Sequence, residues 1–98
     1  MSNIVVTADE ILPRWRALKG SVRLNGELIC EPLTVGARWS LGEVLAHASR
    51  SEQLYPGELF GSGTLPGGSG IETGHELKRG DVVELGIEDI GTLSNPIV

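Results

Sequence analysis

SVRLNGELICE, residues 21–31, is the stretch that decides the local fold. Two runs of alternating apolar and polar residues flank the dipeptide Asn25-Gly26. Both residues of this dipeptide tolerate positive φ, so it favours a type I′ turn whose twist matches the strands on either side. The pattern predicts a β-hairpin. Its apolar face should carry Val22, Leu24, Leu28 and Cys30.

Towards the C-terminus the sequence predicts further short strands. VVELGI at residues 82–87 is an apolar run that begins and ends next to turn signals. The stretch 92–98 predicts a closing edge strand, because its proline has no N–H to donate and an edge strand does not need one there. Residues 58–64 are expected to form another strand, which enters a glycine-rich loop.

Two sequence signatures predict helices. Residues 7–10, TADE, fit an S/T-x-x-E capping box, and Pro13 should limit the helix that follows to about one turn. Trp15 is expected to pack against the core. A second capping box runs from Ser40 to Glu43, and apolar residues then follow at helical spacing. The one good helix is therefore expected near 41–50.

These elements together indicate the fold class. Many short strands, one good helix and turns about every ten residues predict a mainly β (α+β) single domain over residues 1–98, built as a sandwich or roll. A doubly wound parallel sheet does not fit, because strands and helices do not alternate.

Composition excludes several classes of function. The net charge is −5, and the eight Lys and Arg residues form no run that would neutralise a phosphate backbone. No apolar stretch approaches the roughly 20 residues of a membrane span. The single cysteine, Cys30, cannot form an internal disulfide and should be a small buried side chain. We expect a soluble cytoplasmic protein that binds neither nucleic acid nor membrane.

The stretch from Leu54 to Glu72 holds the candidate chemistry. It contains six of the chain's 14 glycines, together with Thr64 and Glu72. A threonine hydroxyl and nearby backbone N–H groups can bind a carboxylate, and a glutamate can orient water or move a proton. The alternative is a structural turn with an exposed glutamate. The pattern matches neither a P-loop nor a nucleophile elbow, and no carboxylate cluster predicts a metal site within this chain alone.

A family resemblance covers most of the chain. The segments SLGEVLAHASRSEQLYPGELFGSGT, GGSGIE and LKRGDVVELGIEDIGTLSNPIV resemble the C-terminal part of the fumarylacetoacetate hydrolase family over roughly residues 38–98, and IVVTADEI and RLNGEL extend the match. The resemblance implies a mixed β-sandwich roll, usually dimeric, that cleaves, isomerises or decarboxylates oxo acids with Mg²⁺ or Ca²⁺. It places Gly63 and Thr64 beside the substrate carboxylate, and Glu72 beside the attacking water.

The matched region does not include all of the family's catalytic groups. The metal-binding carboxylates, a water-activating histidine and a lysine lie upstream of it in the family, and neither His47 nor His75 occupies the histidine's place. Three functions stay open: a domain without its own hydrolase activity that binds small carboxylates, an oxo-acid enzyme subunit completed by a complementary N-terminal polypeptide, or a protein-interaction module. Uncovered strand edges predict a homo-oligomer, a dimer being expected.

Overall fold

The computed structural model describes all 98 residues. Four strands form one antiparallel sheet in the order β2-β1-β3-β4. The strands are β1 (Gly20–Leu24), β2 (Glu27–Cys30), β3 (Val82–Ile87) and β4 (Gly91–Pro96). Two α-helices and three short 3₁₀ helices complete the chain: α1 (Ala8–Ile11), η1 (Leu12–Ala17), η2 (Thr34–Gly36), α2 (Leu41–Ala48) and η3 (Ile71–Thr73).

The hairpin predicted from residues 21–31 is confirmed. Asn25 and Gly26 have φ values of 51° and 85°, as a type I′ turn requires. A bulge shifts the register beyond Val22, which faces Cys30 while Arg23 faces Leu28. Val22 and Cys30 are accordingly buried. The prediction was wrong for Leu28: the extra residue in β2 turns its side chain to the other face, where it is exposed.

The C-terminal strands are also confirmed. β3 lies in the middle of the sheet between β1 and β4. β4 is an edge strand and ends at Pro96, opposite Val82, so the missing N–H interrupts no ladder. The strand stops two residues before the end of the predicted stretch.

The two capping predictions had different outcomes. At α2 the Ser40 hydroxyl accepts from the Glu43 N–H at 3.2 Å, and the Glu43 carboxylate accepts from the Ser40 N–H at 2.7 Å. These bonds lower the pKa of Glu43, the backbone bond contributing most. At α1 the box prediction was wrong, because the Thr7 side chain caps no backbone N–H. Its hydroxyl pairs with the carboxyl of Asp9 instead and lowers the pKa of that group.

One further sequence prediction was wrong. Residues 58–64 form no strand, because their backbone groups bond to no neighbouring ladder. The predicted α+β class is confirmed by one four-stranded antiparallel sheet with two α-helices, and the sandwich arrangement stays a prediction. Pro13 does limit α1 to four residues, but the chain continues through it as the 3₁₀ helix η1.

The core is small. Only eight residues are buried, and none lies between residues 35 and 85. Leu18 and Thr34 are the most deeply buried; the Thr34 hydroxyl accepts from the Leu18 N–H at 3.0 Å and donates to the Leu18 carbonyl at 3.2 Å. The buried residues are Ile11, Leu18, Gly20, Val22, Cys30, Pro32, Thr34 and Gly86.

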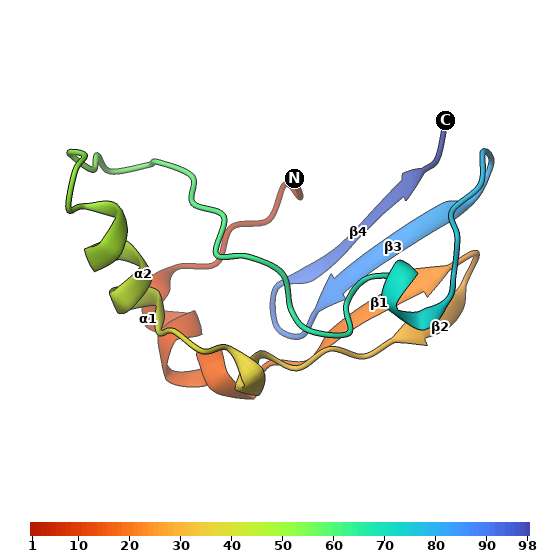
Figure 1. The fold of residues 1–98 in the computed structure, drawn as a ribbon, viewed down its shortest axis with the longest axis horizontal. Helices are drawn as coiled ribbons and strands as arrows, with labels where there is room; N and C mark the ends of the chain where they lie inside the picture. The colour runs from red at the N-terminus through yellow and green to blue at the C-terminus, as the bar shows by residue number, and fades with distance from the viewer.

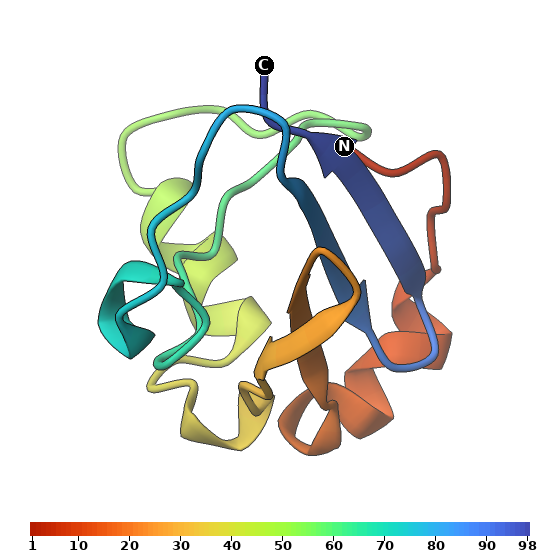
Figure 2. The ribbon, with the colours of Figure 1, turned by 90° about the vertical axis from the view of Figure 1, so that its right-hand side faces the viewer.

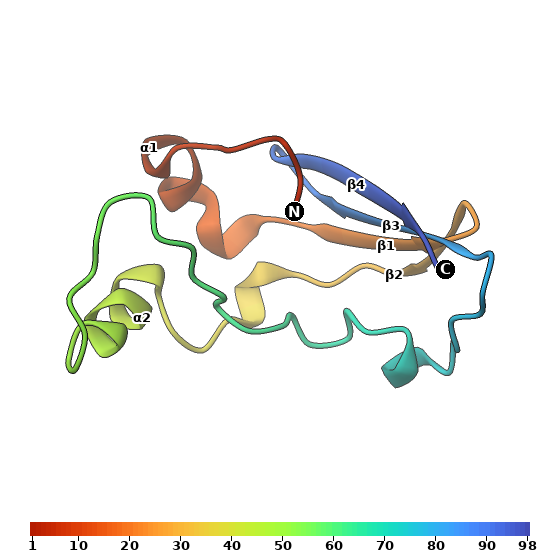
Figure 3. The same cartoon turned by 90° about the horizontal axis from the view of Figure 1, so that it is seen from above.

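Residues 35–67 form an extension that we call the arm. Figures 1 and 3 show α2 and the coil after it standing away from the sheet. Viewed along the long axis, α2 and η3 lie on one side of the molecule, and α1 and β4 lie on the other (Figure 2). No residue of α2 is buried. Six large apolar side chains of the arm are exposed: Val35, Trp39, Leu45, Tyr55, Leu59 and Phe60.

The whole chain has more surface than a globular protein of its size. Its solvent-accessible area is 7445 Å². A folded monomer of 10.4 kDa is expected to expose about 5,400 Å². The radius of gyration, 15.1 Å, likewise exceeds the roughly 13 Å of a compact domain of 98 residues. The sheet therefore packs on a small core, whereas the arm has no buried core of its own.

Candidate functional site

The glycine-rich loop lines a small cavity at the base of the arm. Gly63 has a φ of 95°, a value that glycine adopts without strain, and it turns the chain just before Thr64. The loop faces residues 36–39 and the first half of α2 across a cavity of about 280 Å³. The structure therefore brings Gly63 and Thr64 to a concave surface, where a small ligand fits.

The polar lining of this cavity is made largely of hydrogen-bond donors. Ser62 and Thr64 offer hydroxyls, and Arg38 offers a guanidinium. No aspartate or glutamate lines the cavity, although the chain carries a net charge of −5. The apolar walls come from Trp15, Trp39, Leu41, Val44, Leu65 and Pro66. Such a lining suits a small anion with an apolar body.

Glu72 lies elsewhere. It is an exposed residue of η3 and does not line the cavity that holds Thr64. Its backbone N–H donates to the Ser69 carbonyl at 3.1 Å, which begins the 3₁₀ turn. Within this chain the two polar residues of the glycine-rich stretch therefore do not share one cavity, and the catalytic role of Glu72 stays a prediction.

Next to Glu72, a hydroxyl joins three groups. The Thr73 hydroxyl donates to the Gly70 carbonyl at 3.1 Å, lies 3.0 Å from His75 Nδ1, and lies 3.6 Å from Cys30 Sγ. This network ties η3 to β2, and it gives the buried Cys30 a polar contact that the sequence did not predict.

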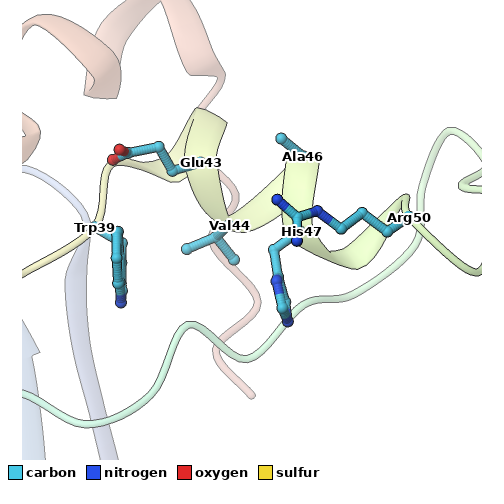
Figure 4. A pocket seen from close by; sticks show the side chains of 6 residues that line it. All are labelled: Trp39, Glu43, Val44, Ala46, His47 and Arg50. Atoms are coloured by element: carbon cyan, nitrogen blue, oxygen red, sulfur yellow. The ribbon is translucent and has the colours of Figure 1, made fainter.

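A second, larger cavity of about 550 Å³ lies along α2. Figure 4 shows the rings of Trp39 and His47 extending to one side of the helix with Val44 between them. The Glu43 carboxylate lies on the other side, where it caps the helix. Glu43 and His47 lie four residues apart on α2, but the cap holds the Glu43 carboxylate away from the His47 ring.

The residues of the chain do not fit a divalent metal ion. No three His, Cys, Asp or Glu side chains lie together in a group that could hold one. The cavity at Thr64 offers hydroxyls and a guanidinium but no carboxylate, whereas protein sites for Mg²⁺ and Ca²⁺ use carboxylate oxygens. No chemical step at this cavity can therefore be assigned to a metal held by these residues.

The fold and the cavity define a class: part of an α+β domain, with one antiparallel sheet and a glycine-loop cavity suited to a small anion. A family model, fumarylacetoacetate (FAA) hydrolase C-terminal, matches residues 1–98. The chain belongs to the fumarylacetoacetate hydrolase family, and the resemblance seen in the sequence is confirmed. The family holds its metal in the N-terminal half of the domain, outside the matched region.

The relatives of this chain are longer proteins. It is 35% identical over 95 residues to a mitochondrial oxaloacetate tautomerase of Rattus norvegicus. The aligned segment covers 96% of this chain and 30% of the rat protein. Among solved structures, it is similar to 5-carboxymethyl-2-hydroxymuconate delta-isomerase from Mycobacterium smegmatis, with a TM-score of 0.68 and 27% identity over 83% of this chain and 30% of the other.

A second solved structure supports the fold alone. Maleylpyruvate hydrolase from Sphingobium has a TM-score of 0.75 and 22% identity, over 95% of this chain and 32% of that one. The chain thus spans about a third of the length of the proteins it matches. None of its helices has the length and apolar character of a membrane span. The predicted cytoplasmic location is untested, and the rat relative is named as mitochondrial.

Two cavity residues escaped the sequence analysis. Arg38 carried no signal, because one exposed arginine in an irregular segment looks like any other surface charge. Trp15 was expected to pack against the core, and it does so only in part, since it is half-buried and also lines the cavity. Its distance from Thr64 in the sequence, 49 residues, hides their proximity.

Proposed function

We propose that this chain supplies one wall of an active site for small oxo acids, and that it lacks hydrolase activity on its own. In this proposal Gly63 and Thr64 bind the substrate carboxylate, while the metal-binding groups come from a complementary N-terminal polypeptide of the family's domain. The donor-lined cavity without carboxylates supports the binding role, because an anion there meets hydroxyls and a guanidinium and no like charge.

The observation that carries the need for a partner is the surface area. The chain exposes roughly 2,000 Å² more than a compact monomer of its mass, compared with about 800 Å² that each partner contributes to a standard interface. The excess matches one side of an obligate interface. The exposed apolar side chains of the arm, such as Leu59 at 79% and Tyr55 at 60%, lie around the cavity's loop and α2. A partner that covers the arm would also close the cavity.

A chimera tests the enzymatic part. The matched C-terminal third of the rat tautomerase is replaced by this chain, and oxaloacetate tautomerisation is measured with and without Mg²⁺, beside this chain alone. We expect metal-dependent turnover in the chimera and none in the isolated chain. Thr64→Val should lower kcat/KM of the chimera about tenfold or more, as loss of a hydrogen bond to a charged group implies, and Thr92→Val on the exposed edge strand should not.

The result that contradicts the proposal is a folded chimera in which Thr64→Val and Thr92→Val are equally active. Glu72→Gln in the same chimera tests the predicted catalytic role of Glu72. A loss in kcat with KM unchanged supports that role, and an unchanged kcat contradicts it.

Self-association is the proposed fate of the uncovered chain. Without the complementary polypeptide, the exposed apolar surface should drive formation of a homo-oligomer, in the simplest case a dimer. Light scattering after size-exclusion chromatography, over a hundredfold range of concentration, measures this. A monomer at every concentration contradicts it.

A further inference from the structure

The exposed face of α2 carries charges of opposite sign at its two ends. Glu43 lies in the first turn of the helix, and Arg50 follows its end, where the Arg50 N–H still donates to the His47 carbonyl at 3.3 Å. Residues at i, i+3, i+4 and i+7 share one face of a helix, so Ala46 and His47 lie between the two charges. All four side chains are exposed and line the cavity along α2.

Neither of these charges is neutralised within the chain. The chain's two ion pairs involve other residues. The Glu43 carboxylate accepts from the Ser40 N–H through one oxygen, Oε2, and its other oxygen can accept a further bond. The guanidinium of Arg16 contributes only the smallest of the effects that lower the pKa of Glu43. Glu43 and Arg50 are therefore both available to a partner.

This face is complementary to itself. Two copies of α2 can pack antiparallel about a two-fold axis that passes between Ala46 and His47. Each Glu43 then lies level with Arg50 of the other copy, and each Ala46 lies level with the other copy's His47. The small Ala46 side chain at the centre lets the two helices approach closely. A parallel arrangement would instead put like charges level, so the charges favour the antiparallel one.

We propose that α2 forms the contact between two copies of this chain, packed antiparallel through the face of Glu43, Ala46, His47 and Arg50. This rests on the self-association proposed above and specifies its surface. Trp39, which is 56% exposed, borders the same cavity and adds apolar area (Figure 4). The chain's excess surface of roughly 2,000 Å² exceeds the about 800 Å² of one standard partner. It therefore leaves room for a complementary polypeptide elsewhere on the arm.

Charge reversal tests the pairing, with the dissociation constant of the dimer measured by analytical ultracentrifugation of the full chain. Arg50→Glu puts two glutamates level at each end of the paired helices. It should weaken the dimer about tenfold or more, because two exposed ion pairs become repulsions. Arg79→Glu makes the same change of charge at an exposed residue of the turn before β3, and it should leave the dissociation constant unchanged.

Glu43→Gln gives a second test that keeps the helix intact, since a glutamine can also complete a capping box. In the unaltered chain this substitution removes an attraction and should weaken the dimer. In the Arg50→Glu background it removes a repulsion and should strengthen the dimer. A merely structural role of Glu43 would change both backgrounds in the same direction.

The inference is overturned if the unaltered chain dimerises and Arg50→Glu dimerises equally tightly. It is also overturned if Glu43→Gln acts in the same direction in both backgrounds. In either case the proposed self-association stands and uses another surface. A chain that stays monomeric at every concentration contradicts both the self-association and this contact, so the two failures are distinguishable.

Discussion

Local sequence signals predict elements in both the sheet and the arm, but the two regions differ in the contacts that stabilise them. The hairpin of residues 21–31 and the helix α2 both form where local sequence signals place them. The hairpin also joins β3 and contributes Val22 and Cys30 to the core, whereas α2 buries none of its residues. Local propensity alone rarely stabilises an eight-residue helix. The proposed partner should therefore stabilise the arm more than it stabilises the sheet.

The largest effect should separate the two regions directly. Leu18→Ala removes a side chain that is 1% exposed and should lower the free energy of unfolding by about 3 kcal/mol. Leu45→Ala, at a side chain of α2 that is 45% exposed, should change it by less than about 0.5 kcal/mol in the isolated chain. Urea denaturation measures both. Equal losses would show that the arm has a core of its own.

A smaller effect should come from the hydroxyl that joins η2 to the start of the sheet. Thr34→Val preserves the shape of the side chain but leaves the buried N–H of Leu18 without its partner, while the Leu18 carbonyl keeps its bond from the Thr34 N–H. Unfolding free energy should fall by about 1–3 kcal/mol. Thr92→Val, on the exposed strand β4, is the matched control and should cost little. Equal losses of unfolding free energy for Thr34→Val and Thr92→Val would contradict this prediction.

Two glycines with similar backbone angles form the next pair. Gly26 (φ 85°) lies in the hairpin turn, and Gly63 (φ 95°) lies in the arm; an added Cβ would meet nothing within 4 Å at either. Gly26→Ala should cost about 1–2 kcal/mol of global stability, because an alanine is strained at positive φ. Gly63→Ala should leave the melting temperature unchanged and reduce the binding of a small oxo acid such as pyruvate. A drop in melting temperature for Gly63→Ala would place the loop within the cooperative core.

The smallest effect concerns a carboxylate at the edge of the sheet. Asp81 accepts from the Asn25 amide at 2.9 Å and from the Lys78 N–H at 2.8 Å, and these bonds lower its pKa, the Asn25 bond contributing most. A depressed pKa in the folded state stabilises the fold above the ordinary carboxyl pKa of about 4, and the benefit is lost as the pH falls through the folded value.

The difference in melting temperature between the unaltered chain and Asp81→Asn should therefore be small at pH 7 and should vanish as the pH falls below about 4. The thermal melts are repeated in steps of pH, with Glu52→Gln in the arm as a control. A difference that persists undiminished at pH 2 would show that the carboxylate charge is not what the hairpin turn uses.

The sequence by itself determined the elements whose cause is local. Asn25-Gly26 required a type I′ turn, Ser40 and Glu43 capped α2, and Pro96 ended an edge strand, because each depends on neighbours a few residues apart. The family followed from motifs that are also contiguous. The sequence pattern placed Leu28 on the wrong face, because the extra residue of the bulge turns the side chains beyond it to the opposite face. No short pattern predicted that bulge.

Only the tertiary structure decided what depends on distant residues. Residues 58–64 read as a strand, yet a strand exists only where a partner lies beside it, and here none does. The meeting of Trp15 and Arg38 with Thr64 at one cavity, and the placement of Glu72 outside it, likewise follow from the folded path of the chain. A sequence specifies which groups are present; the energy of burying and pairing them decides which ones meet.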